Sequence, residues 1–511
     1  MRKRHTAQSA FLNPCILLGL LVFFAGIVLA LFAAANPQSL AREKVYHTNA
    51  PPATPAGGVS EAWVAPYNGQ SQAIAVDASG NVYITGTRDF GLGHEYATIK
   101  YDSAGQQQWV APYNGPGGDD FGRAIAVDSF GNVYVTGYSR SFAGGDFDYA
   151  TIKYDSSGQQ QWVARYNGPA NSYDMADAIA VDTAGNVYVT GAGGLDEYAT
   201  IKYNSAGQQQ WVARYNGGVA ATAIAVDGSG NVYVTGGGQG DYGTIKYNSS
   251  GQEQWVATYN GPANGDDYAF SLALDSAGSV YVTGQSVGLG TSWDYATIKY
   301  TASGQQQWVA RYNGPGNDID VAQALALDDS GNVYVTGFST GMGSAYDYAT
   351  IKYNSAGQEQ WVARYNGPGN TYDAPYAMAL DDSGNVYVTG YGGTTHDYTT
   401  IKYSSDGQQG WIARYSGGTP YGIAVDGSSN VYVTGASVTI KYLQSPNPTP
   451  TATPTATSPT ATPTVTPGVT PTPSDCPGGC TPSPTPTATA TATATRFTPT
   501  PRPRPTSAPR P

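Results

Sequence analysis

The chain has 511 residues, of which 12% are charged and 12% are aromatic, with 65 glycines and 40 tyrosines. This richness in Gly and Tyr argues against helical bundles and coiled coils, which need Ala, Leu, Glu and Lys in quantity. The net charge of −12, with no Lys/Arg cluster outside the extreme termini, excludes nucleic acid as a partner. Cysteine occurs only at Cys15, Cys476 and Cys480, so a disulfide scaffold or a Cys-ligated metal is not expected in the central region.

The first 40 residues are typical of an export signal. A basic start precedes an uncharged apolar run over 15–35, which closes on Ala33, Ala34 and Ala35 as an A-x-A cleavage site would. The run has 21 residues, which is also enough to span a bilayer. The sequence therefore predicts a signal peptide or an N-terminal membrane anchor over 1–40, followed by a linker over 41–60. Membrane contact is expected only through 15–35, and only if that run is retained.

Residues 61–442 repeat one unit eight times, at about 48 residues per copy, which is the length of a propeller blade. One recurring phrase, GNVYVTG, ends at Gly86, Gly137, Gly191, Gly236, Gly284, Gly337, Gly390 and Gly435. A second, Trp-Val-Ala or Trp-Ile-Ala, begins at Trp63, Trp109, Trp162, Trp211, Trp255, Trp308, Trp361 and Trp411. A third phrase, TIKY, also occurs eight times, so the repeat decides the fold.

Each copy resolves into four short strands, which in the second copy are expected at 124–128, 132–137, 149–154 and 159–166. Their β-branched and aromatic content, with Gly, Asn, Asp and Ser between them, is a hairpin signal. Bulky residues occupy both faces of the second strand, as a sheet sandwiched between two others requires. The first strand consists of small Ala, Ile and Val residues, which suit a crowded central axis.

The phase of the repeat predicts how the ring closes. The chain begins with a lone Trp strand over 61–68 and ends with three strands, at 422–425, 430–435 and 438–442. The first segment can therefore supply the missing outer strand of the last blade and remove an open edge. We expect an all-β fold over 61–445, a single eight-bladed β-propeller of four-stranded antiparallel blades. An open solenoid is the alternative, but it would not need this offset start.

From residue 446 to residue 511 the composition changes to Thr, Pro and Ala. Such a tail has few large apolar side chains and cannot bury a core, so the sequence predicts a stiffened, disordered stalk. Its threonines are candidates for O-glycosylation. Cys476 and Cys480 can form a small disulfide loop after export or remain as two thiols.

The units, such as AIAVDSFGNVYVTG followed by DYATIKYDSSGQQQWVARYNGPA, resemble the SBBP family of β-propeller repeats of exported bacterial proteins. The resemblance covers residues 61–442. It implies an extracellular propeller and supplies no catalytic residues. The family name refers to seven blades, whereas this sequence has eight copies.

The turns between the first and second strands, such as DSFGN, hardly vary, and their Asp and Ser residues are expected to cap turn amides. The loops on the opposite face vary and carry two recurring acidic positions, which we call the acidic crown. The first position lies eight residues before the invariant turn Asp, at Asp120, Asp174, Asp267, Asp320 and Asp373. The second precedes the Tyr of the third strand, at Glu95, Asp148, Glu197, Asp241, Asp294, Asp347 and Asp397.

The acidic crown has two interpretations. Its carboxylates can hold Ca²⁺, a hard cation suited to oxygen ligands, or attract a cationic ligand. Alternatively they cap loop amides or pair with a neighbouring blade, which their repetition in most copies favours. The five Arg residues of WVARY and WIARY and the Lys of TIKY are expected to pair with acids or to cover aromatics. Trp293, Tyr372 and Tyr376 are candidates for stacking on sugar rings.

Catalytic constellations are poor, because only His94 and His396 occur in the propeller, in loops of different blades. The leading prediction is an exported propeller, secreted or attached to the cell surface, that acts as a non-catalytic binding scaffold for a protein or glycan ligand. No cofactor is expected apart from the candidate Ca²⁺. The alternatives are a propeller enzyme, such as a lyase or glycan-active hydrolase, and a structural surface-layer component.

Overall fold

The computed structural model describes residues 58–90, 93–141, 145–194, 196–238 and 240–444. The predicted signal segment over 1–40, most of the linker over 41–60 and the Thr/Pro tail over 446–511 lie outside the described residues. The described ranges contain strands and turns and no α-helix, and hence no helix that could cross a membrane. The expected all-β fold is confirmed.

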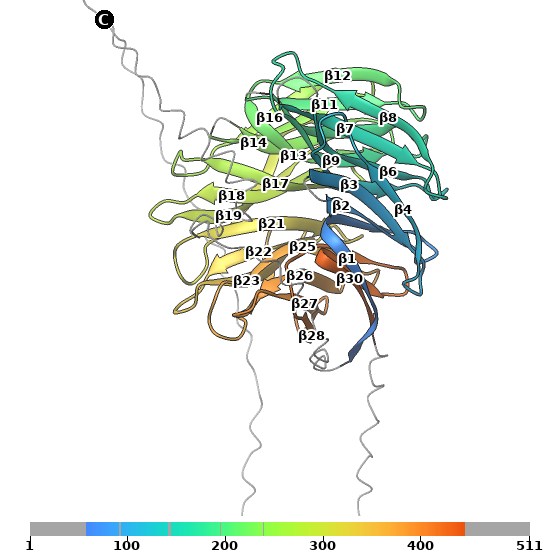
Figure 1. Cartoon of the computed structure of the whole chain (residues 1–511). Coiled ribbons are helices and arrows are strands. Elements are labelled where there is room, and N and C mark those ends of the chain that lie inside the picture. The colour runs from blue at the N-terminus through green and yellow to red at the C-terminus, as the bar shows by residue number, and fades with distance from the viewer. Residues whose placement is uncertain (1–57, 91–92, 142–144, 195, 239, 445–511) are drawn as a thin grey trace, which may run out of the picture. The chain divides into compact units, whose positions relative to one another are not determined.

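The strands follow the four-strand repeat in chain order (Figure 1). Those of the first half are β1 (Val59–Val76), β2 (Val82–Phe90), β3 (Gly93–Tyr101), β4 (Gln107–Tyr113), β5 (Asp120–Val127), β6 (Val133–Arg140), β7 (Phe147–Tyr154), β8 (Gln160–Tyr166), β9 (Asp174–Val181), β10 (Val187–Gly193), β11 (Tyr198–Tyr203), β12 (Gln209–Tyr215), β13 (Gly218–Val226), β14 (Val232–Gly238), β15 (Tyr242–Tyr247) and β16 (Glu253–Tyr259).

The second half repeats the same pattern and ends in one long strand. Its strands are β17 (Asp267–Leu274), β18 (Val280–Val287), β19 (Trp293–Tyr300), β20 (Gln306–Tyr312), β21 (Asp320–Leu327), β22 (Val333–Thr340), β23 (Tyr346–Tyr353), β24 (Glu359–Tyr365), β25 (Ala374–Leu380), β26 (Val386–Gly392), β27 (Asp397–Tyr403), β28 (Gln409–Tyr415), β29 (Pro420–Val425) and β30 (Val431–Gln444).

Consecutive strands pair antiparallel, so that most copies form a four-stranded sheet such as β5-β6-β7-β8. Two larger sheets have simple causes. A single bridge between Gly237 and Tyr268 joins the fourth and fifth copies. The long strand β1 pairs with β30 through its first half and with β2 through its second, which links the two ends of the repeat array.

The first strands begin earlier than the sequence predicted. The expected span in the second copy was 124–128, whereas β5 runs from Asp120 to Val127 and crosses a β-bulge between Gly122 and Ala124. Four members of the acidic crown, Asp120, Asp174, Asp267 and Asp320, therefore open strands instead of lying in loops, and Asp373 directly precedes β25. The backbones of the four strand-opening acids therefore pair with the second strand, as Asp120 does with Ser139.

The core lies between successive sheets. In β6 the side chains of Val133, Tyr134, Val135 and Thr136 are all fully buried, which confirms that both faces of the second strand are covered. Each apolar cluster joins Tyr residues of one sheet to Val and Ile residues of the next, as Tyr83 and Tyr96 do with Val133 and Ile152. Burial of such large side chains stabilises the fold by about 1.5–3 kcal/mol each.

A threonine pair crosses the second and third strands inside every copy. The hydroxyl oxygens of Thr136 and Thr151 are 2.9 Å apart and fully buried, so each group finds its partner within the sheet. The equivalent pairs are Thr85–Thr98, Thr190–Thr200, Thr235–Thr244, Thr283–Thr297, Thr336–Thr350, Thr389–Thr400 and Thr434–Thr439. The last pair shows that β30 carries both the second and third strands of the eighth copy, joined at Ser437, whose φ is 74°.

The first strands of neighbouring copies contact one another. β5 contacts β1 and β9, β13 contacts β9 and β17, and β21 contacts β17 and β25. β29 contacts β25 on one side and β1 on the other, where a Cβ on Gly422 would lie 3.0 Å from Ile74. Beyond their buried opening residues, such as Asp120 and Gly122 of β5, these strands are mostly half-buried, in contrast to the second strands that pack outside them.

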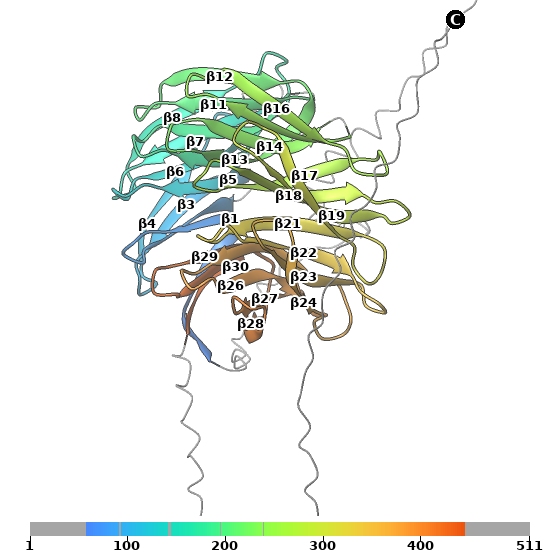
Figure 2. The same ribbon diagram turned by 180° about the vertical axis from the view of Figure 1, so that it is seen from behind.

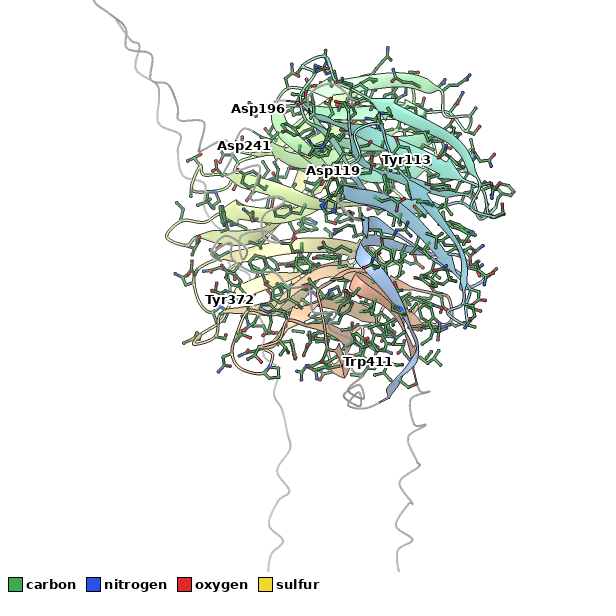
Figure 3. All side chains as sticks on the ribbon, viewed as in Figure 1. Tyr113, Asp119, Asp196, Asp241, Tyr372 and Trp411 are labelled. Carbon is green, nitrogen blue, oxygen red and sulfur yellow. The ribbon has the colours of Figure 1, made fainter. Side chains whose placement is uncertain are left out.

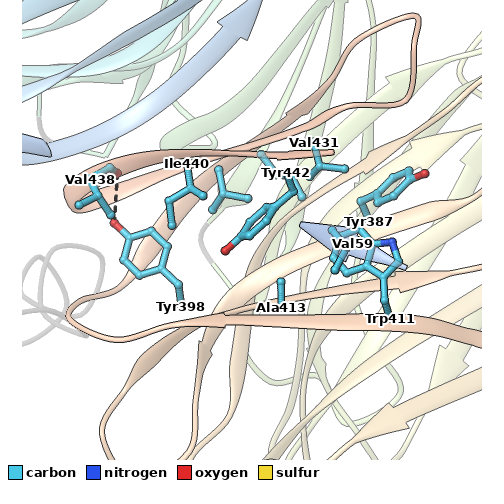
Figure 4. Close-up of a cluster of buried hydrophobic side chains, with 11 residues drawn as sticks. Val59, Tyr387, Tyr398, Trp411, Ala413, Val431, Val438, Ile440 and Tyr442 are labelled. Atoms are coloured by element: carbon cyan, nitrogen blue, oxygen red, sulfur yellow. Dashed lines mark hydrogen bonds between the residues drawn. The ribbon is translucent and has the colours of Figure 1, made fainter. Parts of the chain in front are cut away.

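The first and last strands lie side by side in both views (Figures 1 and 2). Val59 pairs with Gln444 and Pro66 with Val438. Figure 4 shows the cluster behind this pairing, in which Val59 packs with Trp411 and Tyr442, and the Tyr398 hydroxyl donates to the Val438 carbonyl at 3.4 Å. The amino-terminal strand thus contributes to the core of the last sheet.

Candidate functional site

The invariant Asp between the first and second strands holds its turn together. The Asp128 Oδ1 accepts from the amides of Phe130 and Asn132, both at 2.9 Å. Its Oδ2 accepts from the Asn132 side chain at 2.7 Å and from the Tyr134 hydroxyl at 3.0 Å. Burial opposes ionisation, but these hydrogen bonds outweigh it and lower the pKa of Asp128. The same arrangement, with Ser279 replacing the Asn in one copy, is built on Asp77, Asp182, Asp227, Asp275, Asp328, Asp381 and Asp426. The expected capping role is therefore what the structure shows.

In most copies the Trp of the fourth strand fastens the next copy, and the Lys of the third strand lies over a Tyr of its own copy. The Trp109 indole donates to the Ser156 carbonyl at 3.2 Å and lies so close to Gly158 that a Cβ there would be 2.6 Å from the ring. Gly158 also has φ at 84°, so this turn requires glycine on both counts. The Lys100 ammonium lies 5.1 Å from the centre of the Tyr83 ring. The prediction that these residues have a repeated packing role agrees with this geometry.

The first acidic position of the crown is fully buried and caps the loop before it. The Asp320 Oδ2 accepts from the Gly314 amide at 2.6 Å and its Oδ1 from the Thr340 amide at 3.1 Å. Asp120, Asp174, Asp267 and Asp373 accept equivalent loop amides. Burial raises the pKa of all five carboxyls, and that of Asp174 to about 6.

The second acidic position pairs with the Arg of the fourth strand in the same sheet. The Asp148 carboxylate is 2.9 Å from Arg165, and the matching distances are 2.9 Å for Asp294–Arg311 and 3.0 Å for Asp347–Arg364. Glu197 pairs with Arg214 in the same way, whereas Glu95 pairs with Arg88 of β2. Asp397 instead accepts from the Thr395 hydroxyl at 2.7 Å.

The same Arg reaches three further groups. The Arg311 guanidinium donates to the Ser286 hydroxyl and carbonyl, and to the Tyr259 hydroxyl of the preceding copy at 2.9 Å. Arg165 and Arg364 repeat these bonds with Ser139 and Ser339. The guanidinium therefore ties together three strands of one sheet and the outer strand of another.

The Arg and the first acidic position occur together or not at all. Three copies lack the buried Asp and have Gly69, Val219 and Gly418 in its place. These copies also lack the Arg, which is replaced by Pro112, Thr258 and Pro66 respectively. The last correspondence requires the amino-terminal strand to serve the final copy, as its pairing with β30 does. The five copies with the buried Asp thus carry the Arg, and in four of them this Arg forms an ion pair with the second acidic position of the crown.

No group of three or more His, Cys, Asp or Glu side chains suited to a metal ion occurs within the described parts of the chain. Several crown oxygens nevertheless have no protein partner there, among them Oδ1 of Asp120, Asp174 and Asp294. Calcium binding by the crown stays a prediction, which thermal melting with Ca²⁺ and with a chelator would test. His94 and His396 lie in different sheets and stack on Phe121 and Tyr391, with ring centres 5.2 and 5.1 Å apart.

The sequence analysis did not predict a second set of candidate site residues, which lie at bulges in the first strands. In every copy the first strand has a β-bulge, and one residue opposite no partner is inserted at the same place. A bulge redirects the side chain of the extra residue. We call these residues the bulge ring; they are Gln72, Arg123, Asp177, Thr222, Phe270, Gln323, Tyr376 and Tyr421.

The bulge ring is chemically uneven although the strands around it are nearly identical. Arg123 and Asp177 form an ion pair at 3.4 Å between neighbouring copies. Burial raises the pKa of Asp177 despite the attraction of Arg123. On another arc, the rings of Tyr376 and Tyr421 are 5.8 Å apart, and Phe270 packs on the cluster of Val321 and Phe338. All eight side chains are half-buried.

A signal for the bulge ring was present in the sequence. The residue four places before the last apolar residue of the first strand differs among copies, whereas its neighbours hardly change. Variation at one position of a fixed frame is typical of binding surfaces. Because this position does not recur, a comparison of recurring residues does not reveal it; of the eight residues, only Tyr376 is among the candidates named from the sequence.

Comparison with known proteins agrees with this architecture. The model of the SBBP beta-propeller repeat matches residues 108–142, 307–341, 360–396 and 408–437. These segments are SBBP β-propeller repeats. No curated protein shows significant sequence similarity to the chain.

Solved structures similar to this chain are distant in sequence. Sqt1 from Chaetomium thermophilum aligns with a TM-score of 0.52 at 12% identity, over 74% of this chain and 97% of that chain. The WD40 beta propeller domain of Doa1 aligns with a TM-score of 0.41 at 10% identity, over 76% and 97%. A streptogramin B lyase aligns with a TM-score of 0.40 at 15% identity, over 63% and 93%. At such identities the likeness to Sqt1 shows the fold and no function.

Proposed function

We propose that the chain is a closed eight-bladed propeller that acts as a non-catalytic binding scaffold outside the cell. Closure is supported by the contacts of the first strands, which run from β1 through every copy to β29 and return to β1. It is also supported by Trp63, whose indole donates to the Ser103 carbonyl at 3.2 Å, as Trp162 does to Ser205 at 3.1 Å. The amino-terminal strand thus makes the bond to the first copy that six of the fourth strands make to the next copy.

The bulge ring is the proposed ligand site, and its partner is a segment of another protein. The observation that carries the proposal is the variation of one bulged residue in eight otherwise matching strands. Its paired charges, amide side chains and aromatic rings offer the mixture of contacts found in protein interfaces. A non-catalytic role is supported by the crown carboxylates, which are engaged with amides and Arg residues.

Export is the remaining part of the proposal. It rests on the basic and apolar amino-terminal sequence over 1–40 and on the Thr/Pro composition over 446–511, which suits a spacer. The protein would be secreted or attached to the cell surface.

The proposed site is tested by selecting ligands against the full chain. A random dodecapeptide library is panned on the wild type, and the enriched peptides are measured against the variant Arg123→Ala/Tyr376→Ala/Tyr421→Ala by fluorescence polarisation. We expect the variant to bind at least about tenfold more weakly, because it lacks the anchoring rings and charge. Phe130→Ala, which alters an exposed residue of a turn between first and second strands, is the control and should bind unchanged. Peptides that bind the triple variant as tightly as the wild type would refute the site, provided that circular dichroism shows both folded.

A further inference from the structure

Two matching groups of aromatic rings lie on the face that carries the variable loops. In the first, the ring centres of Tyr138 and Phe147 are 5.1 Å apart, and those of Phe147 and Tyr173 are 5.9 Å apart. In the second, the distances are 4.7 Å for Phe338–Tyr346 and 5.1 Å for Tyr346–Tyr372. We call each group an aromatic triad.

The triads use the same three positions of the repeat, four copies apart. One residue follows the Gly of the second strand, one precedes the acid of the third strand, and one precedes the buried Asp of the next copy. The third residue is the most accessible, since Tyr173 is 50% exposed and Tyr372 is 52% exposed. Figure 3 labels Tyr372 at the margin of the molecule. Elsewhere in the described repeats these three positions are not all aromatic.

A hydroxyl beside each outer tyrosine repeats the match. Ser172 and Thr371 precede Tyr173 and Tyr372, and within the described residues neither hydroxyl has a hydrogen-bond partner. A buried hydroxyl without a partner is costly and marks a place where a ligand or water can bind. Two independent features, the rings and the free hydroxyls, therefore coincide in the same two copies.

The acid that follows the middle ring of each triad is paired within the protein. Asp148 and Asp347, which follow Phe147 and Tyr346, pair with Arg165 and Arg364 at 2.9 and 3.0 Å. At the first triad, Arg140 also lies 4.9 Å from the Phe147 ring and pairs with Asp119 at 3.0 Å. A ligand at these places would meet ring faces with the acids Asp146 and Asp318 nearby, which disfavours an anionic molecule and leaves an uncharged one acceptable.

We propose that the two aromatic triads are equivalent binding subsites for a neutral glycan, which border the bulge ring where Phe270 packs on the cluster of Phe338. A sugar ring has an apolar face that suits the ring of the exposed tyrosine and a rim of hydroxyl groups that can bond to the hydroxyl of that tyrosine. In a closed ring of eight blades, copies that are four apart lie across the ring from each other. One chain would then hold glycan chains at two opposite places and link them, with a gain in avidity where both sites engage one polymer.

Calorimetry on the full chain tests the proposal with four defined neutral oligosaccharides, cellohexaose, xylohexaose, mannohexaose and chitohexaose, and with a proline decapeptide. We expect at least one glycan to bind with two sites per chain. Tyr173→Ala and Tyr372→Ala should each leave one site, and the double variant should leave none. Tyr173→Trp should retain both sites, because it preserves the stacking surface.

Two controls separate this proposal from the others. Phe130→Ala removes an exposed ring on the turns between first and second strands and should leave two sites. Thr222→Ala alters the bulge ring in the fourth copy, away from both triads, and should also leave two, so that failure of either site is recognised independently. Absence of binding by all four glycans, binding of the decapeptide in their place, or a stoichiometry that the tyrosine variants do not change would each overturn the proposal.

Discussion

The pKa of an Asp in this protein is lowered or raised according to its burial and the number of hydrogen bonds that it accepts. The turn Asp of every copy accepts several bonds from a partly solvated position, and the pKa of residues such as Asp328 is lowered although burial opposes it. The crown Asp is enclosed and has fewer donors, so burial dominates and raises its pKa. The same residue type therefore stabilises one turn as an anion and is poised to take up a proton in another.

Two adjacent aspartates provide a matched test of the turn. Asp328 accepts hydrogen bonds from the Ser330 and Asn332 amides, the Asn332 side chain and the Tyr334 hydroxyl, whereas the next residue, Asp329, is exposed. We expect Asp328→Ala to lower the free energy of unfolding by about 1–3 kcal/mol, because it strands the buried Tyr334 hydroxyl. Asp329→Ala should change it by less than about 0.5 kcal/mol. Urea denaturation measures both, and equal effects would contradict the capping role.

Stability should also depend on pH through Asp174. Burial is the main cause that raises its pKa from 3.8 to about 6, and the Gly168 amide opposes the rise. Between these two pH values the unfolded chain has lost the proton that the folded chain retains, so stability from this group falls as pH rises from about 4 to 6. Asp174→Asn removes the effect.

The difference in unfolding free energy between Asp174→Asn and the wild type should therefore shift in favour of the variant by about 2 kcal/mol on going from pH 4 to pH 7. Denaturation at the two pH values measures it. A difference that is constant with pH would show that the carboxyl titrates normally in the folded protein.

At the scale of strands and sheets, the repeat predicted the number and order of strands well, but not where each first strand begins. Residues such as Ala124 and Val127 carry a strand pattern, whereas Phe121-Gly122-Arg123 does not, because the bulge at Arg123 interrupts the alternation of sides. Bulge position is set by backbone register, which neither propensity nor periodicity encodes. The pairing of Arg with acids could be predicted, because the Arg and the crown acids both recur at fixed spacing in the sequence.

The Arg residues of the fourth strands are expected to couple sheets energetically. Arg311 and Asp294 connect β20 to β19, and the bond to Tyr259 reaches the preceding sheet. A double-mutant cycle with Arg311→Gln and Asp294→Asn should give an interaction energy of about 1–3 kcal/mol. In contrast, the pairing of Arg311→Gln with the distant Asp329→Asn should be additive. A coupling near zero in the first cycle would mean that the ion pair is not formed in solution.

For the whole molecule, the last sheet depends on residues from the start of the chain. Removal of residues 1–67 would take away Val59 and expose the edge of β30 together with Trp411 and Tyr442, on which Val59 packs. We expect this truncation to lower Tm by more than about 10 °C and to cause self-association, because an open edge and apolar surface are left. Removal of 1–57, which spares β1, should leave Tm unchanged.

Calorimetry and light scattering compare the two truncations. A monomer with the Tm of the full chain after removal of 1–67 would refute closure by β1. The offset of the repeat predicts that the first segment pairs with the last sheet. Only the register of Val59 with Gln444 defines how far this pairing extends.

The register of Val59 opposite Gln444 also has a mechanical consequence. Because the strands run antiparallel and both ends of the polypeptide leave the same end of this ladder, tension applied between them would peel one pair of residues at a time. Such unzipping needs far less force than sliding a whole strand past its neighbour. If the protein is held at one end and loaded at the other, the pairing of β1 with β30 would separate first. The remaining sheets would unfold only after that.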